Sequence, residues 1–275
     1  MLADKRIFFL GAGSMSEAML KGLLATATLP PAQITLSNRQ HVARLEELHT
    51  GYGTVASRDK LAEIAAAEIV VLAVKPFDVA SALAEVGKVL SPGQLLISVA
   101  AGVATAAIEA RIPAGVPVVR AMPNTSSFVQ ESATAICGGR WATAETLELA
   151  SQLFAAIGTV VTVDESAMNA VTGLSGSGPA YIYYVAEALL AAGESVGLSE
   201  ETSRELLLQT LYGAARMLRE TGKSPGELRR QVTSPNGTTM AGIAALDAGD
   251  VGASFRIAVE RATERAREMG QQLNS

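Results

Sequence analysis

The chain has 275 residues, of which 49% are hydrophobic and only 4% aromatic, and its net charge is −5 at pH 7. This length can bury the core of one large or two modest domains, and the acidic balance argues against a nucleic-acid partner. No apolar run approaches the roughly 20 residues that span a bilayer, and residues 1–6 lead too directly into a predicted strand to be a signal peptide. We therefore expect a cytoplasmic protein without a membrane partner.

The sequence offers little for metal or thiol chemistry. Its single cysteine, Cys137, excludes an internal disulfide framework, and its apolar neighbours are typical of a buried small side chain. The two histidines, His41 and His49, fall in one polar predicted helix. With one cysteine and no H-E-x-x-H pattern, we expect no metal site and no histidine-based catalytic dyad.

The first predicted strand, residues 7–10, ends in a glycine turn and is followed at once by helical periodicity. A strand, a glycine turn and a helix N-terminus in this order are typical of a pyrophosphate cradle. Gly11 allows the turn, Gly13 lets the backbone approach the ligand, and the small Ser16 replaces the third fingerprint glycine. The alternative is an ordinary strand–helix turn of an α/β protein. The predicted dinucleotide-binding residues of this turn are Gly11, Ala12, Gly13, Ser14 and Met15.

Strands and helices alternate as far as residue 163. Further strands are predicted near residues 33–37, 54–56, 68–74, 95–99, 116–120, 133–137 and 159–163, with helices near 40–49, from 59, and at 77–90. This alternation predicts an α/β fold with a Rossmann-type, doubly wound parallel sheet and right-handed crossovers. Ligands of such sheets lie beyond the carboxyl ends of the strands. The ends expected to line the cleft are residues 11–15, 37–39, 74–76 and 122–125.

The end of the second strand indicates the cofactor. An NAD site places an acidic side chain here to bind the ribose 2′-hydroxyl, whereas this chain has Ser37, Asn38 and Arg39. A hydroxyl, an amide and a guanidinium suit a 2′-phosphate, because arginine makes bidentate, charge-assisted bonds to it. We therefore expect NADPH, with NADH as the alternative. Arg39 as a solvated loop residue also remains open.

Beyond Asp164 the strand signals disappear and helical signals take over. Helices are predicted near residues 180–196, 199–220, 225–231, 239–247 and 252–269. We therefore place a dinucleotide-binding domain at residues 1–163 and an all-helical domain at 164–275. The long Ala- and Leu-rich helical faces exceed what one small bundle needs, which favours a homodimer or a multiple of dimers.

Two segments of the second half carry unusual polar chemistry. Residues 174–180 place the hydroxyls of Ser175 and Ser177 among glycines. Residues 234–239 separate two predicted helices and resemble a nest of backbone N–H groups suited to a carboxylate. The alternative for each segment is a helix-capping loop.

These motifs together resemble one family, pyrroline-5-carboxylate reductase, over essentially the whole chain. The resemblance rests on Gly11–Met15, Ala73–Pro76, Arg120–Thr125, Val171–Tyr181 and Val232–Thr239. It implies a Rossmann domain followed by a helical dimerisation domain, and NAD(P)H-dependent reduction of 1-pyrroline-5-carboxylate to L-proline.

The resemblance also implies roles for individual residues. Thr239 matches the family's threonine that contacts the ring nitrogen of the substrate. The backbone around Ser234, Asn236, Gly237 and Thr238 would hold the carboxylate, and Ser175, Gly176 and Ser177 would border the substrate. Val74, Lys75 and Pro76 would border the nicotinamide ring, with Asn124 at its carboxamide side. Lys75 as a snorkelling surface lysine remains an alternative.

The chain departs from the family pattern at two places. The closing signature usually has glycine at the position of Asn236, but asparagine also tolerates left-handed backbone, so we expect the loop to survive. The family often has asparagine on the adenosine side near the third strand, where spacing places Lys60, with Arg58 nearby. A cation there still suits a phosphate, so Lys60 joins the predicted cofactor site.

Two other functions are alternatives to this one. One is a related imine or 3-hydroxyacid dehydrogenase, but such enzymes usually carry a catalytic lysine on the first long helix of the second domain, and residues 179–196 contain none. The other is a non-catalytic dinucleotide-binding redox sensor, which would not need the segments 175–179 and 234–239.

Overall fold

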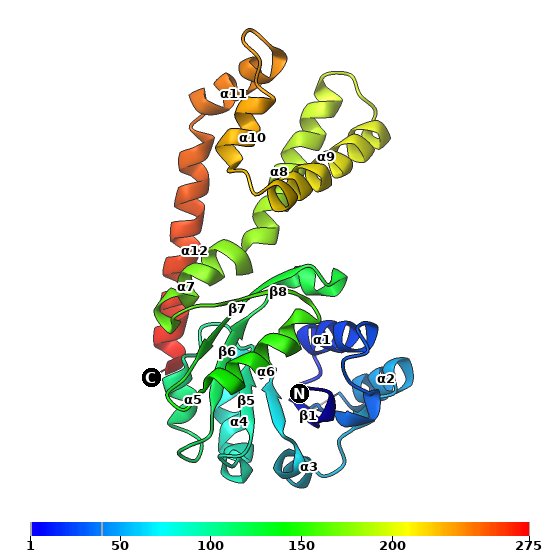
Figure 1. Ribbon diagram of the computed structural model, residues 1–275, viewed down its shortest axis with the longest axis vertical. Coiled ribbons are helices and arrows are strands. Elements are labelled where there is room, and N and C mark those ends of the chain that lie inside the picture. Colours follow the sequence, from blue (N-terminus) through cyan, green and yellow to red (C-terminus); the bar gives the residue numbers. More distant parts are fainter. Residues whose placement is uncertain (1, 40, 275) are drawn as a thin grey trace. The chain divides into compact units, whose positions relative to one another are not determined.

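The computed structural model describes residues 2–39 and 41–274. These residues form an eight-stranded sheet in the order β3-β2-β1-β4-β5-β6-β7-β8 (Figure 1). The strands are β1 (Ile7–Leu10), β2 (Ile34–Ser37), β3 (Val55–Ala56), β4 (Ile69–Leu72), β5 (Leu95–Ser98), β6 (Val118–Met122), β7 (Ser132–Gly138) and β8 (Gly158–Thr162). Strand order reverses at β1, which pairs in parallel with β2 on one side and β4 on the other. The predicted doubly wound architecture is confirmed.

One strand departs from the predicted parallel arrangement. β7 runs antiparallel to β6, with Arg120 opposite Cys137, whereas all other neighbouring pairs are parallel. The connection from β6 to β7 spans residues 123–131 and holds only a short 3₁₀ helix, η5 (Thr125–Val129). A parallel crossover needs a dozen or more residues, so this short link reverses the chain direction.

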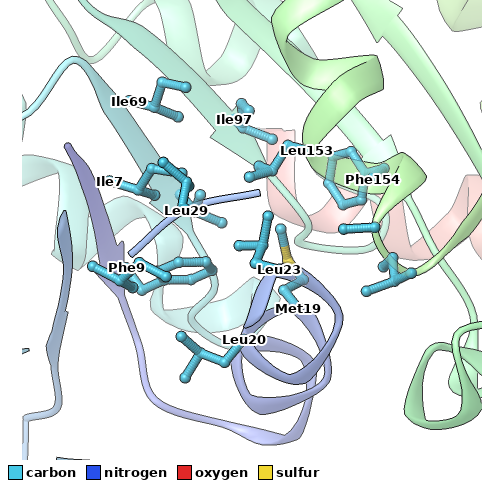
Figure 2. Close-up of a cluster of buried hydrophobic side chains, with 14 of the residues drawn as sticks. Ile7, Phe9, Met19, Leu20, Leu23, Leu29, Ile69, Ile97, Leu153 and Phe154 are labelled. Carbon is cyan, nitrogen blue, oxygen red and sulfur yellow. The ribbon is translucent and has the colours of Figure 1, made fainter. Parts of the chain in front are cut away.

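Helices cover both faces of the sheet. α1 (Ser14–Ala25), α2 (Val42–Tyr52) and α6 (Ala144–Ala155) pack on one face, and α3 (Lys60–Ala66), α4 (Val79–Val86) and α5 (Thr105–Glu109) on the other. Ile7 and Phe9 of β1 face the first layer, and Phe8 and Leu10 face the second. Figure 2 shows the first layer, where side chains of α1 meet Leu153 and Phe154 of α6. Burial on both faces explains the continuous apolar runs of the strands. The sequence pattern predicted neither α5 nor α6.

From residue 165 onward the structure is helical. It comprises η6 (Glu165–Ala167), α7 (Met168–Val171), the π-helical turn η7 (Thr172–Gly176), α8 (Gly178–Ser195), α9 (Glu200–Thr221), α10 (Pro225–Gln231), α11 (Thr238–Ala248) and α12 (Val251–Asn274). Side chains cap two of these helices, since Ser199 accepts from the N–H of Thr202 at 3.2 Å and Ser224 forms a capping box with Glu227. In the segment considered as a possible capping loop, residues 174–176 belong to η7 and residues 178–180 to α8, with a bend at Ser177 between them.

The chain divides into two compact units. One comprises the residues up to Pro179 together with those from Glu260 onward, and the other is Ala180–Val259. In the second unit Ser203 is the one buried residue among those described. Many of its large apolar side chains are exposed, among them Ile182, Tyr183, Tyr184, Leu206 and Tyr212. No helix in the part of the chain that the structure describes has the length and apolarity required to cross a membrane.

Candidate dinucleotide and substrate sites

The turn after β1 has a backbone that only glycine adopts without strain. Gly11 has a φ of 118°, and a Cβ there would lie 2.6 Å from the carbonyl oxygen of Ala73. Ser16, which occupies the third fingerprint position, is fully buried, and its hydroxyl donates to the carbonyl of Gly11 at 2.8 Å. A small side chain here therefore permits close packing of helix on strand and also fastens the turn.

The N-terminus of α1 is open toward the carboxyl end of the sheet. Gly13 is its N-cap, and a Cβ on Gly13 would meet no described atom within 4 Å. The first helical hydrogen bond runs from Glu17 to Gly13 at 3.1 Å, so the N–H groups of Ser14, Met15 and Ser16 precede the helical ladder. Free N–H groups, the positive end of the helix dipole and an unobstructed glycine fit a dinucleotide pyrophosphate.

A network of charged side chains from α1 and α2 contacts the glycine turn. The sequence pattern did not predict this network. The carboxylate of Glu17 contacts Arg44, accepts from the hydroxyl of Tyr52 at 2.9 Å and lies 3.4 Å from Lys21. Arg44 also donates from Nε to the carbonyl of Ala12 at 3.4 Å. Burial raises the pKa of Glu17, but the hydrogen bonds and cations around it outweigh burial and leave that pKa below its ordinary value. No periodicity links residues so far apart in the chain.

At the end of β2, Ser37 and Arg39 lie in different environments. Ser37 is buried, and its hydroxyl points into the sheet, where it donates to the carbonyl of Phe9 at 3.4 Å. The side chain of Arg39 is 67% exposed and pairs with Asp78 at 3.4 Å. No acidic residue occupies positions 37–39. The exposed cation at this strand end is thus Arg39, whereas the Ser37 hydroxyl bonds within the sheet and its carbonyl accepts from the N–H of Gly11 at 3.1 Å.

Lys60 begins α3, where Asp59 is the N-cap. Its ammonium group pairs with Glu85, and its side chain is 27% exposed. This pairing offsets the positive charge of Lys60 that was expected to bind a phosphate. Lys60 as a cofactor residue stays a prediction.

The end of β4 lies beside the glycine turn, because Gly11 contacts Ala73 and the N–H of Ala73 donates to Leu10 at 3.0 Å. Val74 is partly buried against the second core layer, and Lys75 is exposed in extended backbone. Pro76 then opens a 3₁₀ turn. Val74, Lys75 and Pro76 therefore follow the strand that neighbours β1 at the reversal of strand order, where such sheets bind their ligands.

The end of β6 contacts the π-helical turn η7. Asn124 caps η5 by accepting from Ser126 at 3.1 Å, and its amide nitrogen donates to the carbonyl of Ser175 at 3.2 Å. The structure thereby brings Asn124 together with Ser175, Gly176 and Ser177, which the sequence separates by about fifty positions.

The closing signature forms a tight turn before α11, in the second unit. Asn236 has a φ of 58°, so the left-handed backbone expected at this position is confirmed. Gly237 is the N-cap of α11, and a Cβ there would lie 2.4 Å from the hydroxyl of Ser234. Thr238 and Thr239 are the first two residues of α11, so their N–H groups point out of its N-terminus. Within the described residues the Thr239 hydroxyl makes no hydrogen bond and is not the helix cap.

No group of three or more metal-ligating side chains occurs in residues 2–39 and 41–274. Burial, with a contribution from the charge of Glu165, raises the pKa of the Cys137 thiol to about 11. This thiol lies on β7, buried in a cluster with Ala135 and Met168, and makes a poor nucleophile near neutral pH.

Comparison with known families matches both halves of the chain. The family described as "Pyrroline-5-carboxylate reductase dimerisation" matches residues 165–269, and "NADP oxidoreductase coenzyme F420-dependent" matches residues 6–102. Pyrroline-5-carboxylate reductase 1 of Bacillus subtilis is 40% identical over 98% of this chain and 91% of that protein. Pyrroline-5-carboxylate reductase of Methanosarcina acetivorans is also 40% identical, over 98% of this chain and all of that protein.

Solved structures of pyrroline-5-carboxylate reductases also resemble this structure. A pyrroline-5-carboxylate reductase from Coxiella burnetii superposes with a TM-score of 0.91 at 37% identity, covering 96% of this chain and 98% of the other. The Plasmodium falciparum pyrroline carboxylate reductase, solved with NADP bound, has a TM-score of 0.85 at 26% identity and covers 97% of this chain and 98% of the other. This chain belongs to the pyrroline-5-carboxylate reductase family.

Proposed function

We propose that this protein reduces 1-pyrroline-5-carboxylate to L-proline with NADPH, the final step of proline biosynthesis. The observation that carries the proposal is its likeness to pyrroline-5-carboxylate reductases over 98% of its length. When bound, NADPH supplies the hydride that reduces the carbon of the cyclic imine.

The first unit holds the cofactor. The N–H groups at the start of α1 bind the pyrophosphate, because Gly11 and Gly13 leave the backbone accessible there. Arg39 binds the 2′-phosphate by a charge-assisted hydrogen bond. Val74, Lys75 and Pro76 border the nicotinamide ring.

The closing signature holds the substrate. The N–H groups of Thr238 and Thr239, at the start of α11, offer a carboxylate the same kind of nest that α1 offers a pyrophosphate. The Thr239 hydroxyl donates a hydrogen bond to the ring nitrogen and keeps it polarised while the carbon is reduced. Orientation and electrostatic stabilisation supply most of the rate enhancement for an imine, so a hydroxyl is a sufficient polar group.

Assembly, domain division and location form part of the same proposal. The match of residues 165–269 to the family described as "Pyrroline-5-carboxylate reductase dimerisation" supports self-association, and we propose a homodimer or a multiple of dimers. We propose residues 1–163 as the NADPH-binding domain and 164–275 as the dimerisation and substrate domain. A cytoplasmic location completes the proposal, and cell fractionation tests it.

An NADPH oxidation assay with 1-pyrroline-5-carboxylate tests the activity. The protein should consume NADPH with this imine and leave 3-hydroxyacids with NADP⁺ unreacted. A 3-hydroxyacid dehydrogenase would show the reverse, and a redox sensor would bind NADPH without turnover.

A matched pair of glycine variants adds a control. Gly11→Ala should abolish NADPH binding and turnover, because its Cβ would overlap the carbonyl of Ala73. Gly51→Ala lies in α2, where a Cβ meets no described atom within 4 Å, and should retain both. Turnover by Gly11→Ala at the rate of Gly51→Ala would contradict the assigned pyrophosphate site.

A further inference from the structure

The π-helical turn η7 sits where the helical hydrogen-bond ladder is interrupted by proline. In an α-helix the carbonyl of residue 175 accepts from the N–H of residue 179, but Pro179 has no N–H and its ring crowds the carbonyl four positions before it. The helix widens instead, and the N–H of Ser177 donates to Thr172, five residues earlier, at 2.9 Å. The carbonyl of Ser175 is therefore without its usual helical donor.

Asn124 supplies the missing donor. Its Nδ2 lies 3.2 Å from the carbonyl oxygen of Ser175, on a segment 51 positions away in the chain. The other end of the same amide is also engaged, because Oδ1 accepts from the N–H of Ser126 at 3.1 Å. The backbone N–H of Asn124 donates to Ser132 at 3.1 Å. Two hydrogen bonds thus fix the orientation of this side chain, and a third holds its backbone.

Two neighbouring contacts hold the same turn. The hydroxyl of Ser175 donates to the carbonyl of Ala133 at 3.0 Å, at the start of β7. Gly176 lies against Met122 at the end of β6, where a Cβ would come within 2.7 Å of the methionine methyl. The turn η7 is therefore attached to the sheet at the end of β6 and the start of β7.

We propose that Asn124 is a positioning residue that replaces the hydrogen bond removed by Pro179 and thereby holds Ser175, Gly176 and Ser177 in place beside the substrate. This role differs from the direct contact with the nicotinamide carboxamide that the family resemblance implied for Asn124. The predicted effect of Asn124 on turnover rests on the proposed function. The attachment of the turn itself is testable without substrate.

Asn124→Asp tests the donor alone. The aspartate keeps an oxygen that accepts from Ser126, but it places a second oxygen toward the Ser175 carbonyl where the amide donated. Amide hydrogen exchange of residues 172–177 should accelerate by about tenfold, which corresponds to one lost hydrogen bond. The kcat/KM for 1-pyrroline-5-carboxylate should fall about tenfold or more, with the dissociation constant for NADPH within about twofold of the unmodified value.

Ser132→Ala is the matched control. It removes the acceptor of the Asn124 backbone N–H and leaves the amide and the Ser175 carbonyl unchanged. It should lower the melting temperature while exchange of residues 172–177 and kcat/KM stay near their unmodified values.

Pro179→Ala provides a second test, because it restores an N–H for the Ser175 carbonyl. In this background the Asn124→Asp substitution should accelerate exchange of residues 172–177 by a clearly smaller factor. An equal factor in both backgrounds would overturn the proposed link between Asn124 and Pro179.

The remaining outcomes are also decisive. Unchanged exchange in Asn124→Asp overturns the attachment, and faster exchange with unchanged kcat/KM overturns the positioning role. An NADPH dissociation constant weakened as much as kcat/KM would assign Asn124 to the cofactor instead. If the unmodified protein does not reduce 1-pyrroline-5-carboxylate, the proposed function fails, while the exchange measurements still decide the attachment.

Discussion

The buried guanidinium of Arg120 forms an ion pair with Glu165 at 3.4 Å, joining β6 to the segment that follows β8. The Arg120 side chain is 5% exposed and that of Glu165 is 30% exposed. Glu165 also accepts from the N–H of Thr105 at 2.8 Å and contacts its hydroxyl, so it caps the N-terminus of α5. Among the described residues the second terminal nitrogen of Arg120 has no hydrogen-bond partner. Glu165 is therefore the carboxylate that pairs with the buried guanidinium of Arg120.

Glu165→Gln should destabilise the protein by about 2–3 kcal/mol, because it leaves a buried guanidinium without a counter-charge. Urea denaturation followed by circular dichroism measures this loss. Glu148→Gln is the control, since Glu148 lies on exposed α6 surface and its replacement should stay within about 0.5 kcal/mol. Equal stability of the two variants would show that Arg120 does not need this partner.

Glu17 predicts a pH dependence of stability. Its pKa in the folded protein lies below the ordinary value of 4.5, so the ionised form is favoured by folding. The resulting stabilisation is complete above the unfolded pKa and is lost as pH falls through the folded pKa. The difference in unfolding free energy between the unmodified protein and Glu17→Gln should thus be largest above pH 4.5 and shrink in more acidic solution.

Denaturant titrations at a series of pH values measure this difference. Glu46→Gln, at an exposed position of α2, is the control and should differ little from the unmodified protein at every pH. If the difference in unfolding free energy between the unmodified protein and Glu17→Gln grew as the pH fell, the proposed role of the charges around Glu17 would be wrong.

Arg39 should determine the preference for NADPH over NADH. Arg39→Asp should reverse or flatten that preference, with a loss of about tenfold or more in kcat/KM for NADPH, because a carboxylate repels the 2′-phosphate. Asp78→Asn should raise the preference, since it removes the carboxylate that competes for Arg39. Equal efficiency with both cofactors, unchanged in Arg39→Asp, would remove Arg39 from the site.

Thr239 should affect turnover more than stability. It is the second residue of α11 behind a glycine N-cap, so Thr239→Ala should cost little folding free energy. Turnover should fall tens- to hundreds-fold, roughly 2–3 kcal/mol in the barrier, with NADPH affinity little changed. Thr239→Ser should keep most activity because it keeps the hydroxyl.

Steady-state kinetics beside melting curves separate these effects. Thr221→Ala, which loses a hydroxyl bonded to the carbonyl of Met217, is the control and should retain turnover. Near-normal turnover in Thr239→Ala with a lowered melting temperature would make Thr239 a structural residue.

The exposed apolar side chains of the second unit should be covered by a second copy. Sedimentation at micromolar concentration should show a dimer or a multiple of one. Tyr184→Glu should weaken assembly and activity together, because Tyr184 is 72% exposed on α8 in the single chain and a charge there opposes burial. Val42→Glu is the control, at 75% exposure on α2, and should leave assembly intact. A fully active monomer would contradict the expectation.

Local chemistry made much of this molecule predictable. The glycine turn between β1 and α1 follows from residues within one turn of each other, and so do the caps at Ser199 and Ser224. The left-handed backbone of Asn236 follows from the tolerance of asparagine for positive φ. Apolar runs located the central strands, because a strand buried on both faces has no polar side to alternate with.

Other features depended on partners distant in the sequence. The direction of β7 was decided by the length of the β6–β7 connection rather than by its own apolar pattern. Ser37 has a suitable hydroxyl for a phosphate, yet the sheet turns that hydroxyl toward Phe9. Glu17 and Arg44 meet only because α1 and α2 pack on one face of the sheet.

The sequence by itself therefore determined the family, the alternating fold and the local backbone of the glycine turn and the closing signature, since these depend on residues within a few positions of one another. Only the tertiary structure decided that Asn124 donates to Ser175 and that Arg120 depends on Glu165. A hydrogen bond or ion pair across 45 or 51 positions leaves no periodic trace in the sequence, because it arises from how the sheet brings its strand ends and the following helices together.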